Sequence, residues 1–137
     1  MTYAVSAALQ RAIFEKLTTT TALTDLVGTD IFDALPTGPL PPLYVVLGAE
    51  DVRDASDKLA GGAWHQFTIA VVTLSAGFAS AKAAAGAVCD ALLDETLLLD
   101  RGQLVSLNFL KAKASRVGPG ANRQINLIFR ARVADET

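Results

Sequence analysis

The chain contains one histidine, His65, and one cysteine, Cys89, the residue types best suited to nucleophilic chemistry. A thiolate beside an imidazole base would be the chemistry of a small cytosolic hydrolase. Cys89, however, lies on the apolar stripe of a small-residue helix predicted over residues 79–93, where it behaves as a buried small hydrophobic residue. His65 is expected to be a partly exposed residue at a strand start. We therefore expect no catalytic residues, and the hydrolase stays open as the alternative from another functional class.

The same residue counts bear on metal binding. A transition-metal site usually needs three or four His, Cys or carboxylate ligands, which a single histidine and a single cysteine do not supply. The acids between residues 49 and 62 could bind Ca²⁺, but their spacing misses the alternating ligand pattern and no glycine occupies the sharp-turn position. We expect no metal site and no cofactor, and we interpret this segment as a long exposed loop that faces solvent or a partner. Its charged residues are Glu50, Asp51, Arg53, Asp54, Asp57 and Lys58.

The elements that would position these residues follow from hydrophobic periodicity. Apolar residues at helical spacing predict two main helices over residues 3–17 and 79–93 and a short one over 22–27. Alternating or short apolar runs predict strands. The strands are expected at residues 30–35, 43–47, 64–74, 104–116 and 123–133. This order predicts one domain spanning residues 1–137, of α+β class, with an antiparallel or mixed sheet of about four to five strands and two main helices packed on one face.

The last two predicted strands form a hairpin with an irregularity. In residues 123–133 the apolar side chains alternate without interruption. In residues 104–116 the apolar phase changes by one residue, which predicts a bulge near Phe109 and Leu110.

Charge is distributed unevenly along the chain. Residues 1–100 carry twelve acidic and five basic residues, whereas residues 101–134 carry seven basic residues and no acid. Oppositely charged blocks allow copies to attract one another head to tail. The basic strands raise nucleic acid as a partner, but the chain has a pI near 5.2 and its aromatic residues do not interleave with the basic ones. We expect at most passive exposure of Arg130 and Arg132 to passing DNA, with no sequence-specific binding.

The composition is unusually apolar. Hydrophobic residues make up 51% of the chain, charged residues 19%, and mean hydropathy is +0.36. The longest uncharged run, residues 59–81, contains too many polar residues and glycines for a membrane span, and residues 1–17 do not resemble a signal peptide. We expect the surplus apolar surface to lie in contacts with other proteins.

Six segments together resemble a known family. These are YAVSAALQRAIFEKL (residues 3–17), PLYVVLG (42–48), HQFTIAVVT (65–73), KAAAGAVCDAL (82–92), LVSLNFL (104–110) and LIFRARV (127–133). In this order they resemble the tail terminator, or tail completion, proteins of long-tailed phages, especially those of the phage-derived gene transfer agents of alphaproteobacteria. The resemblance covers nearly the whole chain and rests on core elements, with no catalytic signature to carry over.

The resemblance implies a structural protein at the head-proximal end of a phage-like tail, assembled in the bacterial cytoplasm. Copies of the chain would form a hexameric ring that ends the tail tube and contacts both the tube protein and the head-side connector or stopper. A head–tail adaptor or stopper ring is the alternative within the same class. We predict that the interface to the next subunit or the tube includes the six charged residues of segment 49–62 together with Arg130 and Arg132.

Overall fold

The computed structural model describes residues 3–55, 61–74, 77–94, 96–116, 118 and 122–135. Three helices are defined, α1 (Ser6–Thr19), α2 (Thr21–Val27) and α3 (Ala79–Asp94). Five strands form one sheet: β1 (Ile31–Phe32), β2 (Leu43–Asp54), β3 (Gly62–Thr73), β4 (Gln103–Arg116) and β5 (Arg123–Ala134). The α+β class with a mixed sheet is confirmed.

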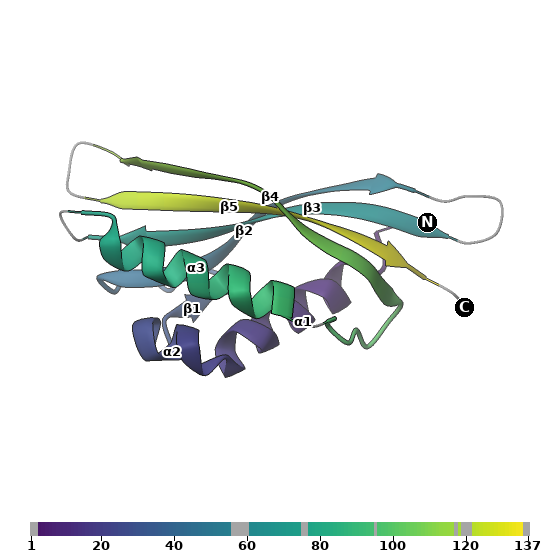
Figure 1. Ribbon diagram of the computed structural model, residues 1–137, viewed down its shortest axis with the longest axis horizontal. Helices are drawn as coiled ribbons and strands as arrows, with labels where there is room; N and C mark the ends of the chain where they lie inside the picture. Colours follow the sequence, from purple (N-terminus) through teal and green to yellow (C-terminus); the bar gives the residue numbers. More distant parts are fainter. Residues whose placement is uncertain are drawn as a thin grey trace.

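The strand order in the sheet is β1-β2-β3-β5-β4. The short β1 runs parallel to β2 and pairs with it only at Val45 and Val46, while the other neighbours are antiparallel. β4 therefore forms one edge of the sheet. The three helices cover the same face, and none of the described residues forms a helix on the opposite face (Figure 1).

The core lies between the helices and the covered face of the sheet. The predicted alternation in β5 is confirmed, because Ile125, Leu127, Phe129, Ala131 and Val133 are all buried. The small side chains of α3 are buried as well, which lets this helix pack closely over β3, β4 and β5.

An aromatic stack marks the centre of this core. The Phe129 ring is fully buried and stacks on the Phe67 ring at a centroid distance of 5.5 Å. On its other side it contacts the ring of Phe109, on edge strand β4, edge to face at a centroid distance of 5.9 Å. Both geometries are favourable for aromatic rings. The stack joins β3, β5 and β4 across the sheet.

The bulge predicted in the last hairpin is confirmed. The register of β4 against β5 shifts between Phe109 and Lys111, and a second shift lies between Leu104 and Ser106. Each shift leaves one β4 residue without a paired partner on β5, Leu110 and Val105 respectively.

The prediction of a loop over residues 49–62 is wrong for residues 49–54. β2 continues through Asp54 after a register shift between Leu47 and Glu50, and it pairs with β3 up to Ala63. Its polar sequence is tolerated because this half of β2 has one side on the helix-free face. The charged residues of the segment up to Asp54 are thus fixed on a strand.

Candidate functional site

Charged residues gather on the helix-free face of β2, β3 and β5. Paired residues of antiparallel strands point to the same face. Asp51 pairs with Gln66 and Arg53 with Trp64, while Gln66 and Trp64 pair in turn with Arg130 and Arg132 of β5. Five of these side chains line a hollow on this face, namely Asp51, Arg53, Trp64, Gln66 and Arg130.

Trp64 orients two of the arginines of β5, Arg130 and Arg132. The guanidinium carbon of Arg130 lies 4.3 Å from the centre of the indole ring, and that of Arg132 lies 5.2 Å from it. Arg132 also donates a hydrogen bond of 3.0 Å to the carbonyl of Ala55. Cation–π contacts of this kind orient a guanidinium without neutralising its charge. The face therefore presents positive charge from a fixed position.

Four of the predicted interface residues are brought together here: Asp51, Arg53, Arg130 and Arg132. The ion pair between Asp51 and Arg53, at 3.5 Å, joins side chains that are 58% and 80% exposed, so it adds little stability and both remain accessible to a partner. Glu50 and Asp54 pair with Phe67 and Ala63, which are buried, and so belong to the helix-covered side. Asp57 and Lys58 lie outside the described residues.

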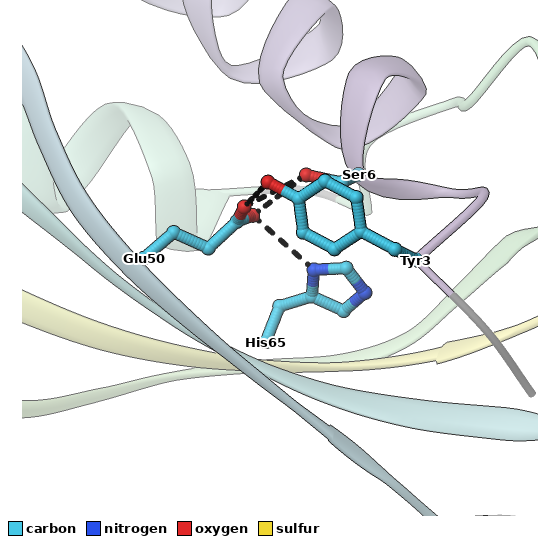
Figure 2. Close-up of polar contacts among 4 residues, drawn as sticks. All are labelled: Tyr3, Ser6, Glu50 and His65. Atoms are coloured by element: carbon cyan, nitrogen blue, oxygen red, sulfur yellow. Dashed lines mark hydrogen bonds and ion pairs between the residues drawn. The ribbon is translucent and has the colours of Figure 1, made fainter.

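Glu50 is the centre of a second polar group, between β2, β3 and the start of α1 (Figure 2). Its carboxylate accepts hydrogen bonds from the Tyr3 hydroxyl and from Ser6 Oγ, the latter at 2.8 and 2.9 Å to the two oxygens. One of these oxygens also lies 3.4 Å from Nδ1 of His65. The Glu50 side chain is 22% exposed and His65 is fully buried.

These contacts change the pKa of Glu50. Burial alone would raise it, but the hydrogen bonds from Tyr3, Ser6 and His65, with the attraction of the imidazole, outweigh burial and lower the pKa below its ordinary value of 4.5. The ionised carboxylate therefore ties the beginning of α1 to the sheet.

The prediction of a partly exposed His65 is wrong. The residue points to the helix-covered side, where Glu50 and Tyr3 lie beside it (Figure 2). Within the described residues its Nε2 has no hydrogen-bond partner. The group is not arranged as a catalytic triad, since Ser6 donates to the carboxylate, whereas a triad serine donates to the imidazole.

Cys89 offers a poor nucleophile. It is half-buried on α3 and packs against the core. Burial raises the pKa of its thiol, and the neighbouring Asp90 carboxylate raises it further. A catalytic cysteine needs the opposite shift, because the thiolate is the reactive form.

Comparison with known proteins identifies the family of the chain. Residues 11–134 match the family of the tail completion protein gp17. The chain belongs to this family.

A solved structure extends the match for this tail completion protein. A chain from the structure titled "Virion of native gene transfer agent (GTA) particle" is 56% identical, with a TM-score of 0.92, over 97% of this chain and 99% of that one. That chain is part of a gene transfer agent virion, which agrees with the location expected from the sequence. No curated protein matches the chain. The resemblance to tail completion proteins is thus confirmed.

Metal binding and membrane insertion are two further possibilities for the tail completion protein. Among the residues that the structure describes, no three His, Cys, Asp or Glu side chains are grouped closely enough to hold a metal ion. In the same part of the chain, none of the helices combines the length and the apolar character of a membrane span.

Sequence reasoning missed three residues of the tail completion protein that matter here. The sequence pattern assigned Tyr3 and Ser6 only to an amphipathic helix, and it assigned Trp64 only to the start of a strand. Apolar alternation places Trp64 and Arg132 on strands, but it does not set the register that pairs them. Nothing in the sequence places Tyr3 and Ser6 beside Glu50.

Proposed function

We propose that this tail completion protein is a structural, non-catalytic component of the tail of a gene transfer agent or similar phage-like particle. The observation that carries the proposal is the 56% identity, over nearly the whole chain, to a chain of a gene transfer agent virion. The raised pKa of the Cys89 thiol and the enclosed position of His65 argue against the hydrolase alternative.

In this proposal, copies of the chain form a hexameric ring at the head-proximal end of the tail. The ring ends the tail tube and contacts the tube protein on one side and the head-side connector on the other. DNA passes through its lumen without being read. The separation of charge supports head-to-tail contact between copies, because acids dominate residues 1–100 and bases dominate residues 101–134.

The charged residues of the helix-free face are the proposed subunit or tube interface. Asp51, Arg53, Arg130 and Arg132 contribute its exposed charge. The proposal also includes Asp54, on the helix-covered side of β2, and Asp57 and Lys58, which lie outside the described residues. Glu50 acts from the opposite side of the strand, where its hydrogen bonds to α1 hold β2 in place. Apolar burial supplies most of the affinity of such an interface, while charge selects the partner and the register.

The experiment is to image particles assembled without this protein by negative-stain electron microscopy. A tail terminator is required to stop tube growth and to allow joining, so its loss leaves overlong or unattached tails beside filled heads. Heads that lose their DNA beside free tails of normal length would instead establish the stopper function and overturn the terminator proposal. Restoring the wild-type chain is the control.

A further inference from the structure

In the part of the chain that the structure describes, the sheet has two long unpaired edges. At one edge lies β4, whose strand neighbour among these residues is β5. At the other edge β1 covers β2 only at Val45 and Val46, so within the described residues β2 has no strand beside Leu47–Arg53 on the side away from β3. Natural proteins rarely leave long strand edges uncovered, since the exposed backbone groups readily pair with another chain.

The β4 edge also exposes apolar side chains. The two bulge residues Val105 and Leu110 are 62% and 41% exposed, and Phe109 is 43% exposed. Phe109 points to the helix-covered side, where its ring meets Phe129. On the β2 edge, Leu47 and Val52 are half-buried and point to the same side. Both edges can therefore contribute apolar contact on the helix-covered side.

Charge distinguishes the possible partners of β4. The strand carries Lys111, Lys113 and Arg116 and no acid. Two β4 strands paired with each other would bring these cations together, which is unfavourable across strands. The second half of β2 carries Glu50, Asp51 and Asp54 against Arg53 alone. The acidic β2 edge of another copy therefore complements the charge of the basic β4 edge, whereas a second β4 edge would repel it.

Strand direction also permits this pairing. Because β2, β3, β5 and β4 are antiparallel in turn, β4 runs opposite to β2. A second copy placed beside β4 in the same orientation therefore offers its β2 as an antiparallel neighbour, the more stable arrangement. A head-to-tail contact joins two different surfaces of the same chain. When each copy is rotated relative to the last by a suitable angle, repeating this contact closes a ring.

We propose that β4 of one subunit pairs antiparallel with residues 47–53 of β2 in the next subunit, so that neighbouring sheets join edge to edge. In the register proposed, Lys111 and Lys113 lie next to Asp51 of the neighbour, because all three residues are on the helix-free face and their charges are opposite. The inference rests on the proposed ring, because it needs self-association.

A zero-length carbodiimide cross-linker tests the contact on the unaltered chain. Within one subunit β2 and β4 are three strand spacings apart, roughly 14 Å, which is too far for a direct amide between Asp51 and Lys111. We mix ¹⁴N- and ¹⁵N-labelled chain, cross-link, and identify the joined peptides by mass spectrometry. Mixed-isotope peptides joining Lys111 or Lys113 to Asp51 are expected. Assembled copies whose cross-links map elsewhere would overturn the edge contact while leaving the ring intact.

The same cross-linking experiment on intact particles covers the case in which the ring forms only on the tail tube. The same cross-link is expected there. If Lys111 and Lys113 join only to another tail protein, β4 binds that partner and the inference is wrong. If the purified chain stays monomeric and no copy is cross-linked to another in particles, the proposed ring itself fails.

Charge exchange supplies an independent test. Lys111→Glu with Lys113→Glu should weaken self-association by about tenfold or more at low salt, and so should Asp51→Lys. Mixing the two variants should restore assembly, because each altered edge then meets the complementary one on the other variant. Lys82→Glu, the same charge change on α3, is the control and should assemble normally. Fluorescence of Trp64 verifies folding, and two folded variants that stay apart when mixed would overturn the proposal.

Discussion

A carboxylate oxygen of Glu50 lies 3.4 Å from Nδ1 of His65, on the neighbouring strand and diagonally offset in register, since Glu50 itself pairs with Phe67. The same carboxylate receives Ser6 Oγ from α1. One acidic side chain thus links two strands and the first helix, and this link has measurable consequences for stability.

Replacing Glu50 with glutamine should lower the free energy of unfolding by about 1–3 kcal/mol at pH 7, the usual cost of losing hydrogen bonds to a charged group. Urea unfolding followed by Trp64 fluorescence measures it. Asp51→Asn, on the exposed side of the same strand, is the matched control and should change little. Equal effects of the two substitutions would contradict the role assigned to Glu50.

The contribution of Glu50 should also depend on pH in one direction. Its pKa in the folded chain lies below the ordinary 4.5, so folding favours the ionised form. This stabilisation is present above pH 4.5 and is lost as the pH falls through the folded pKa. The stability difference between wild type and Glu50→Gln should therefore shrink in acid. A difference that stays constant from pH 7 to pH 3 would contradict this.

Phe129→Ala should destabilise the chain by about 3–5 kcal/mol, because the ring is fully buried between two others and its loss leaves a cavity. Phe109→Ala should cost less, since that side chain is already 43% exposed. Chemical denaturation of both variants compares them, and a reversed order would show that the aromatic stack is not the centre of the core.

Gly102→Ala should be more damaging than Gly28→Ala. Both glycines have positive φ, +73° and +61°, in backbone regions that cost residues with a side chain roughly 1–3 kcal/mol. A Cβ at Gly102 would additionally lie 2.6 Å from the carbonyl oxygen of Ala134, whereas one at Gly28 meets nothing within 4 Å. Thermal unfolding of the two variants gives the comparison, and equal melting temperatures would exclude the clash.

Cys89 should react slowly with a thiol reagent at pH 7, because burial and then Asp90 raise its pKa and reduce the thiolate population. Denaturant should accelerate the reaction. Labelling of the folded chain as fast as that of the unfolded chain would revive the hydrolase hypothesis.

Arg130→Glu with Arg132→Glu should weaken association of the chain with itself or with the tube, and more so at low salt, because exposed charges are screened. Sedimentation velocity over a salt series measures this for self-association. Unchanged assembly would remove these two arginines from the proposed interface.

The sequence predicted most elements because their periodicity was clear. In β5 the buried residues alternate from Ile125 to Val133, and in α3 the small residues recur at helical spacing. The phase change at Phe109 and Leu110 was strong enough to place a bulge. Local patterns of this kind report which face of an element is buried.

The site was less predictable, for a physical reason. Residues 49–54 read as a loop because charge normally marks exposed connections, yet here the strand lies where one side faces solvent and the other meets α1. His65 read as partly exposed because its burial depends on Glu50 and on the start of α1, both distant in sequence. Contacts between segments that are distant in the sequence produce no periodic pattern from which they could be predicted.

The position of β5 between β3 and β4 has a consequence for how the subunit is made. A nascent chain synthesised only as far as Arg116 has no neighbour for β4 and lacks one side of β3, so most of its sheet cannot form. Pairing must wait for residues 123–134, which makes folding a late event in translation. A product that stops before residue 123 therefore lacks the strand that joins β3 to β4.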